Sequence, residues 1–198
     1  MPRRELSALA GIGVDAWSDA YAQIMPALTD GRLSKAEGFG ELLRACGRQV
    51  RPDLVRAMVG RDRELLLANA RLFDDAVPFL RGLRASGIKI AIVSNCTENT
   101  RPLLSKLGVD ALADALVLSC EVGAAKPAAE IFACALERLG VAADGAVFVD
   151  DQAGYCAGGI AAGIRSVQIA RDGLDGVTSA AGTTVVRSLT EVGSVLGA

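Results

Sequence analysis

The sequence contains no histidine among its 198 residues. Ser-His-Asp and Cys-His nucleophilic sites need a histidine, and zinc is most often bound by one, so this absence excludes those arrangements. Any chemistry must therefore rest on carboxylates, lysine, hydroxyls or thiols. The five cysteines show no CxxC spacing and are odd in number, which favours a reducing compartment over a disulfide framework.

Long apolar runs and excess positive charge are also lacking. Charges or glycines interrupt every apolar run before it approaches the about 20 residues that a membrane-spanning helix needs. The N-terminal MPRRELSALAGIGV has no small-residue cleavage site after its short apolar stretch. A net charge of −2 offers no basic field for a nucleic-acid backbone. We therefore expect a cytoplasmic monomer or homodimer that binds neither membranes nor nucleic acids.

With 51% hydrophobic residues, the chain has enough apolar side chains for a proper core. Residues 16–70 carry a helical pattern. Ser34 and Glu37 have the spacing of a capping box, and Pro52 can open a further helix. The first apolar stripe at helical spacing comprises Trp17, Tyr21, Ile24 and Leu28. These features predict a small helical domain over residues 1–72.

After Phe73 the pattern alternates between short strands and helices. The expected strands are 88–93, 116–118, 146–149 and 166–169, with an edge strand at Val185 and Val186. We expect 88–93 to be buried on both faces, because its residues are β-branched and apolar. Residues 73–198 are therefore predicted to form an α/β core with a Rossmann-like, doubly wound parallel sheet.

Polar residues follow the predicted strands where ligands bind in such sheets. Ser94 and Asn95 follow the first strand, and Asp150 and Asp151 follow the third. Lys126 precedes the helix expected at 128–139. Taken singly, each residue could cap a helix or be solvated. Together they favour a site.

Three segments resemble conserved motifs of haloacid dehalogenase-like hydrolases. IKIAIVSN, GAAKPAAEIF and AVFVDDQAG are similar to the second, third and fourth motifs of that family. The resemblance covers nearly the whole chain, because the residues before Phe73 are similar to the helical cap of one subgroup. LFDDAVPFLRGLRASG resembles the helix that returns from the cap to the core. Asp74 and Asp75 would then lie outside the active site.

The resemblance implies a role for each residue of the site. Ser94 and Asn95 would hold phosphoryl oxygens, and Lys126 would neutralise charge on the nucleophile and the phosphate. Asp151 would bind Mg²⁺, with Asp150 as an auxiliary acidic group. This set is chemically consistent, because a carboxylate cannot approach a phosphate dianion unless cations screen both.

The sequence departs from the family pattern in two places. Tyr155 stands where the family often has Asn or Asp, so support of the metal loop would differ. No DxD occurs in the sequence, and in the family that motif supplies the nucleophile and the general acid/base. Asp15 and Asp19 do not replace it, because their spacing is that of helix neighbours. This sequence alone is therefore expected to be inactive by the family mechanism.

The missing motif also has a structural consequence. In the family the first strand lies at the centre of the sheet, between the strands of the second and fourth motifs. Without it, two inner strands would keep unpaired backbone groups beside an apolar slot. We expect the central first strand to be missing from this chain. The hypothesis is that about 15 residues, a strand and a loop, are lost before Met1.

The leading functional hypothesis is a Mg²⁺-dependent phosphatase that acts on a small phosphorylated metabolite through an aspartyl-phosphate. One alternative is a catalytically inactive protein that binds a phosphorylated ligand or a partner. Another is a haloacid dehalogenase-type hydrolase of carbon–halogen bonds. The paired acids Asp150 and Asp151 favour phosphate chemistry, since a dehalogenase needs no metal to neutralise a dianion.

Cys96 lies next to the predicted phosphate site, on the N-terminal side of a helix, where a thiolate is stabilised. A tolerated small residue is the simpler interpretation. Oxidation at this position would make the site redox-sensitive, and Cys96→Ser would remove that sensitivity.

Overall fold

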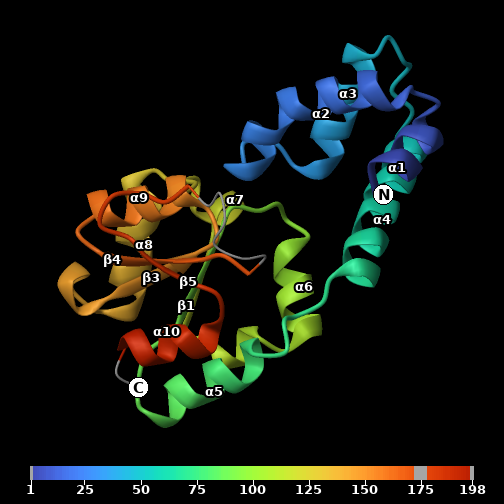
Figure 1. Cartoon of the computed structure of the whole chain (residues 1–198). Helices are drawn as coiled ribbons and strands as arrows, with labels where there is room; N and C mark the ends of the chain where they lie inside the picture. Colours follow the sequence, from blue (N-terminus) through green and yellow to red (C-terminus); the bar gives the residue numbers. More distant parts are fainter. Residues whose placement is uncertain (1, 172–177, 197–198) are drawn as a thin grey trace. The chain divides into compact units, whose positions relative to one another are not determined.

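A computed structural model describes residues 2–171 and 178–196 (Figure 1). These residues belong to two compact units. The first unit comprises Met1–Arg71, Asn95–Lys106 and Leu118–Gly123, and the second comprises Leu72–Ser94, Leu107–Val117 and Ala124–Ala198. The division into a cap at 1–72 and a core at 73–198 stays a prediction. Within the described ranges, every helix is too short or too polar to cross a membrane.

Four helices build most of the first unit: α1 (Pro2–Ala10), α2 (Val14–Thr29), α3 (Lys35–Ala45) and α4 (Pro52–Asn69). Their apolar faces meet in one core that includes Trp17, Phe39, Leu42 and Met58, each almost fully buried. Figure 1 shows these helices in blue to cyan, with α4 as the longest. The predicted helical character of this region is confirmed.

Local signals set the beginnings of these helices. Ser34 and Glu37 form the expected capping box at the start of α3, and Pro52 is the first residue of α4. The helix α1 was not predicted, because Glu5 and Ser7 interrupt its apolar run. In the structure Leu6 and Ala10, one turn apart, are buried and give α1 its apolar side.

One lysine is buried in the first unit. The Lys35 Nζ donates to the Tyr21 hydroxyl at 3.0 Å and lies 3.2 Å from Asp62 Oδ2. Asn99 donates to the same Asp62 oxygen at 3.0 Å. Burial lowers the pKa of Lys35, but the nearby Tyr21 and Asp62 outweigh it and raise this pKa above its usual value. Lys35 is therefore a satisfied structural cation.

Five strands follow: β1 (Ala91–Ser94), β2 (Ala115–Leu118), β3 (Val147–Asp150), β4 (Arg165–Ile169) and β5 (Thr184–Val186). They form two sheets. One sheet pairs β1 with β2, and the other has the order β3-β4-β5 with parallel neighbours. In the second sheet Asp150 is in register with Gln168. The β1 and β3 strands therefore each lie at the edge of a sheet.

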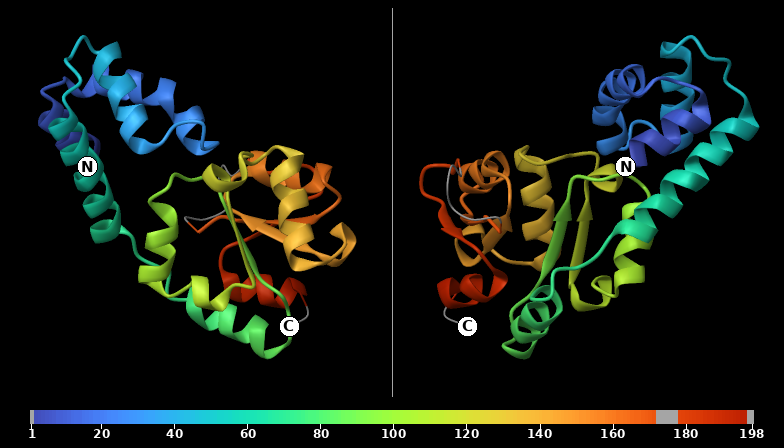
Figure 2. Two further views of the ribbon diagram at one scale, coloured as in Figure 1. Left: turned by 180° about the vertical axis from the view of Figure 1, so that it is seen from behind. Right: turned by 45° about the vertical axis from the view of Figure 1, so that its right-hand side comes forward.

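The other helices are α5 (Ala76–Ala85), α6 (Thr100–Leu107), α7 (Ser119–Val122), α8 (Ala129–Leu139), α9 (Ala153–Ala161) and α10 (Leu189–Leu196). Single 3-10 turns lie at Asp110–Leu112 and Ala143–Gly145. In the second unit, α8 and α9 lie on one side of the β3-β4-β5 sheet, and α5 and α10 lie on the other (Figures 1 and 2). Helices on both faces are the mark of a doubly wound α/β fold.

The α/β class and the alternation of strands and helices are confirmed, including the edge strand at 184–186. Burial of 88–93 on both faces was wrong. Ile88 is 37% exposed, and all four residues of β1 are only half-buried. The reason is that, within residues 2–171 and 178–196, β1 pairs with a strand on one side only. The helix α10 was not predicted.

Asp75 connects three elements of the second unit. Its carboxylate accepts two hydrogen bonds from Arg171, both at 3.0 Å, and one from the backbone of Leu189 at 2.9 Å. The Arg171 guanidinium also lies 3.9 Å from the centre of the Phe73 ring. Hydrogen bonds from Arg171 hold the pKa of Asp75 below its usual value. Asp75 thus links the start of α5 to Arg171 and to the start of α10.

Gly158 in α9 gives a test of the packing beside Lys126. A Cβ at this position would lie 2.7 Å from both the Cβ and the carbonyl oxygen of Pro127. Since backbone cannot yield as a flexible side chain does, Gly158→Ala is expected to destabilise the fold by about 1–3 kcal/mol. Gly154→Ala in the same helix is the control, because its Cβ would meet nothing within 4 Å. Chemical denaturation measures both, and equal midpoints would contradict the expectation.

Candidate active site

Lys126 brings the ends of β1 and β3 together. Its Nζ lies 2.5 Å from Asp150 Oδ2 and donates to the Val93 carbonyl oxygen at 3.2 Å. Asp150 is the last residue of β3, and Val93 is the penultimate residue of β1. The two sheets are thus joined at their carboxyl ends by one ammonium group. Sequence analysis predicted Lys126 and Asp150 as part of one site, and the structure brings these two residues together.

The Lys126–Asp150 ion pair is buried, with each side chain 8% exposed. The ammonium lies 4.8 Å from the centre of the Tyr155 ring and 5.6 Å from that of Phe148. Aromatic faces attract cations. Tyr155, which departs from the family pattern, therefore packs beside the ammonium of Lys126. Sequence analysis flagged Tyr155 only as altered support for the metal loop.

The two neighbouring carboxylates have different surroundings. Asp150 Oδ1 accepts a hydrogen bond from the Gln152 backbone at 2.9 Å, and its other oxygen faces Lys126. The Asp151 side chain belongs to a more exposed residue. Partial desolvation and the adjacent Asp150 raise the pKa of Asp151 above its usual value. Two neighbouring carboxyl groups, those of Asp150 and Asp151, therefore lie together at the carboxyl end of β3.

Oxygen donors are the ligands that Mg²⁺ prefers, so Asp150 and Asp151 fit a hard divalent cation by chemistry. They supply only part of a ligand set. Over residues 2–171 and 178–196, no group of three or more His, Cys, Asp or Glu residues is placed to hold a metal ion. A complete magnesium site would need further oxygen ligands from water, substrate or another segment.

Ser94 and Asn95 were predicted to hold phosphoryl oxygens. Ser94 is the last residue of β1 in the second unit, and Asn95 begins the next segment of the first unit. Both are half-buried. Their binding roles stay predictions.

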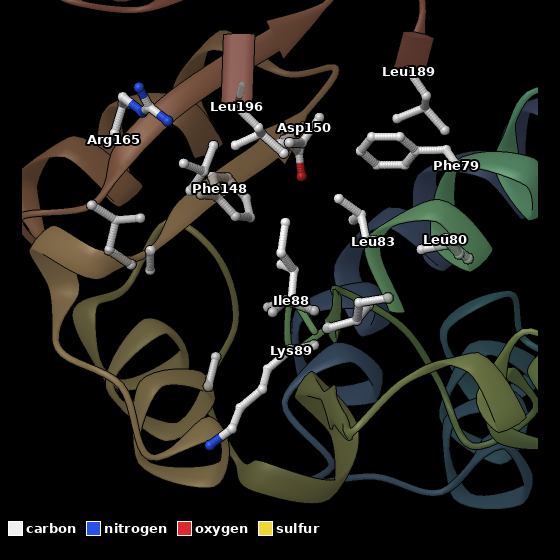
Figure 3. Close-up of a pocket in the computed structure, with 18 of the residues that line it drawn as sticks. Phe79, Leu80, Leu83, Ile88, Lys89, Phe148, Asp150, Arg165, Leu189 and Leu196 are labelled. Carbon is white, nitrogen blue, oxygen red and sulfur yellow. The ribbon is translucent and has the colours of Figure 1, made fainter. Parts of the chain in front are cut away.

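A cavity of about 1300 Å³ opens in the second unit between β1 and β3. Figure 3 shows side chains from α5, α10 and β3 around an open centre, with Asp150 facing it. Most of the lining is apolar, as shown by Phe79, Leu83, Val93, Phe132, Val149 and Leu189. The cavity runs along the edges of β1 and β3 that have no neighbouring strand among the described residues.

Gln168 was missed by sequence analysis. It lines the same cavity, is 4% exposed, and donates from Nε2 to the carbonyl oxygens of Asp151 and Thr178 at 3.2 and 3.1 Å. Its Oε1 is buried without a hydrogen-bond partner. A buried polar atom of this kind calls for an explanation. The signal was present in the sequence, since Gln168 lies between the apolar Val167 and Ile169 of a predicted strand.

Comparison with known proteins decides the family. The haloacid dehalogenase-like hydrolase family matches residues 4–163, which is most of the chain. The chain belongs to this family. The predicted membership of this family is thereby confirmed.

Relatives of this haloacid dehalogenase-like hydrolase include several phosphatases. It is 30% identical to a glyceraldehyde 3-phosphate phosphatase of Methanopyrus kandleri over 72% of this chain and 62% of that protein. It is 31% identical to Phosphatase MT3486 of Mycobacterium tuberculosis over 95% of this chain and 77% of that protein. A ribulose-1,5-bisphosphate 5-phosphatase of Halopiger xanaduensis is 36% identical over 51% of this chain and 43% of that protein. The chain thus spans about 62% of the first relative's length.

Solved structures share the fold. A HAD phosphatase from Thermococcus onnurineus superposes with a TM-score of 0.71 at 24% identity, covering 98% of this chain and 86% of that one. A 2-haloacid dehalogenase from Pseudomonas syringae pv. Tomato DC3000 superposes with a TM-score of 0.75 at 20% identity, covering 98% and 87%. At these identities the likeness shows the fold alone, and both phosphatases and dehalogenases have it.

Proposed function

We propose that this chain is the greater part of a Mg²⁺-dependent phosphatase that acts on small phosphorylated metabolites. The observation that carries the proposal is the cluster of Lys126, Asp150 and Asp151 at the carboxyl ends of two strands, beside an apolar cavity between β1 and β3. The relatives named as phosphatases of glyceraldehyde 3-phosphate and ribulose-1,5-bisphosphate support a phosphorylated sugar or triose as substrate.

Each residue of the cluster has a chemical task in this proposal. Lys126, held at 3.2 Å from the Val93 carbonyl, places a positive charge between the two strand ends. Ser94 and Asn95 would donate hydrogen bonds to phosphoryl oxygens, and Asp151 with Asp150 would hold the metal. Bound Mg²⁺ would neutralise the phosphate dianion. Lys126 stays paired with Asp150, so its charge is fixed before the substrate arrives.

The nucleophile is proposed to lie on a strand that fills the cavity between β1 and β3. A strand inserted there would pair with both open edges and bury apolar side chains against Phe79, Val149 and Leu189. A carboxylate just beyond its carboxyl end would lie near Lys126, because Val93 and Asp150 mark that end of the neighbouring strands. Residues 1–198 alone would then bind phosphate without hydrolysing phosphate esters.

A dehalogenase is the rival reaction, since dehalogenases share the fold. The pair Asp150 and Asp151 favours the phosphatase. Adjacent acids, with the pKa of Asp151 raised by desolvation and by Asp150, are stabilised by a bound divalent cation. A halogen-bearing substrate has no dianion for that cation to neutralise.

The test uses an extended chain, defined as residues 1–198 preceded by the residues encoded directly upstream in the same reading frame. With Mg²⁺ it is expected to release inorganic phosphate from triose or sugar phosphates. EDTA should abolish the release because the metal is removed. Release of halide from 2-haloacids without metal, and no phosphate release, would overturn the proposal.

Asp151→Asn in the extended chain is the matched variant. It removes one metal-binding charge at an exposed position, so the fold should persist while the Mg²⁺ concentration needed for half-maximal activity rises at least about 10-fold. Asp144→Asn, in the turn before β3, is the control and should leave that concentration unchanged. If both variants behave alike, Asp151 is not a ligand.

A further inference from the structure

Cys96 and Cys120 lie side by side in the first unit. Their sulfur atoms are 3.8 Å apart. Each cysteine is the second residue beyond a strand, Cys96 after β1 and Cys120 after β2, and these strands are neighbours in one sheet. Neighbouring strands are about 4.8 Å apart, so equivalent positions beyond them have α-carbons within the range that a disulfide can span.

The backbone around both cysteines is held in place. The Cys96 N–H donates to the buried Ser119 hydroxyl at 2.8 Å, which anchors it to the residue before Cys120. Arg101 makes a two-pronged ion pair with Glu121, the residue after Cys120, at 2.7 and 2.6 Å. Gly31 approaches so closely that a Cβ there would lie 2.1 Å from the Cys120 carbonyl oxygen. The thiols are therefore kept together by their surroundings.

A cavity beside this pair is large enough for a small oxidant. Cys120 is half-buried and lines a cavity of about 680 Å³ whose wall also includes Ser34, Thr97 and Arg101. Cys96 is 9% exposed, and its sulfur lies within 3.8 Å of the Cys120 sulfur that lines the cavity. Hydrogen peroxide is little larger than water, so a cavity of this size admits it.

We propose that Cys96 and Cys120 form a reversible disulfide when the protein meets a peroxide. In the first step the Cys96 thiolate attacks one peroxide oxygen, the O–O bond breaks, and water leaves after protonation, giving a sulfenic acid. In the second step the Cys120 sulfur attacks the Cys96 sulfur, the S–O bond breaks, and a second water leaves. Two thiols are oxidised and one peroxide is reduced to two waters.

The order of the two steps follows from the state of Cys120. Burial and the neighbouring Cys96 raise the pKa of Cys120 to about 12, so Cys120 stays a thiol at neutral pH. The proposal therefore assigns the resolving step to Cys120 and the attack on the peroxide to Cys96. Because resolution needs the Cys120 thiolate, ring closure should accelerate as pH rises through 8 to 10. The cross-link would restrain the loop that begins at Asn95.

The experiment treats the reduced protein, residues 1–198, with stoichiometric hydrogen peroxide and counts free thiols by alkylation and intact mass. The wild type should lose two of its five thiols and about 2 Da, with the 96–120 cross-link in the peptide map. Dithiothreitol should reverse the change. Cys96→Ser should keep all four of its thiols at the same dose, whereas Cys120→Ser should lose only the Cys96 thiol, as a sulfenic acid, and form no cross-link.

Cys134→Ser is the matched control, because Cys134 is a half-buried cysteine of the second unit and should still allow two thiols to be lost. Two results would overturn the proposal. One is oxygen addition at Cys96 without a cross-link in the wild type. The other is loss of two thiols in Cys120→Ser, which would show that different cysteines react.

Discussion

The extended chain is expected to hydrolyse a phosphate monoester on the order of 10⁴-fold faster than residues 1–198 alone, or more, when both are assayed with Mg²⁺. The reason is the nucleophile, since removing a covalent catalyst costs this much or more in enzymes that form an intermediate. The measurement is phosphate release under identical conditions. Asp→Asn at the first Asp of the restored DxD should bring the rate down to that of residues 1–198.

The same extension should stabilise the fold. The cavity between β1 and β3 is about 1300 Å³ and is lined mainly by apolar side chains. Filling it with a strand of about five residues would bury two or three large apolar side chains, each worth about 1.5–3 kcal/mol. The denaturation midpoint should therefore rise strongly. It should also rise in the Asp→Asn variant, because packing does not depend on the nucleophile.

Two outcomes would contradict this prediction. If residues 1–198 hydrolyse the ester as fast as the extended chain, the nucleophile lies within the chain. If the upstream reading frame encodes no apolar strand followed by DxD, the proposed phosphatase has no nucleophile. The chain is then better described as a protein that binds a phosphorylated ligand through Ser94 and Lys126 without turnover.

Lys126→Met is expected to have the second largest effect. The substitution keeps the unbranched stem but leaves the buried Asp150 carboxylate, 8% exposed, without its counter-charge. Removing one partner of a buried ion pair costs about 3–5 kcal/mol. Binding of inorganic phosphate should be lost as well, because the fixed cation between the strand ends is gone. Urea denaturation and calorimetric titration measure the two effects separately.

The double variant Lys126→Met/Asp150→Asn separates stability from binding. With a neutral amide at 150 no buried charge is left unpaired, so most of the lost stability should return. Phosphate binding should not return, since the ammonium is still missing. If the double variant binds phosphate as well as the wild type, Lys126 acts only as a structural partner of Asp150.

How much the sequence could predict depends on the range of the interaction. The capping box of Ser34 and Glu37 and the helix start at Pro52 are local, and both were predicted correctly. Lys126 and Asp150 were predicted for one site because residues at the carboxyl ends of parallel strands converge, and they form an ion pair. Exposure of β1 was not predicted from its own residues, since it depends on which strands are its neighbours.

Other features depended on contacts between segments far apart in the chain. The contact between the Tyr155 ring and the Lys126 ammonium joins residues 29 positions apart. No local sequence pattern predicts such a contact. Gln168 was visible as an odd amide in a strand, but its two acceptors, Asp151 and Thr178, are defined only by the folded chain. The pairing of Cys96 with Cys120 likewise needed the order of the strands.

The sequence by itself determined the α/β class, the family motifs and the absence of a DxD. Periodicity, capping and motif spacing depend only on residues that are close together in the sequence. Only the tertiary structure decided that β1 and β3 lie at the edges of separate sheets, with a cavity of about 1300 Å³ between them. It also decided that Lys126 joins Val93 to Asp150. Such features arise when distant segments pack, and packing is a property of the whole fold.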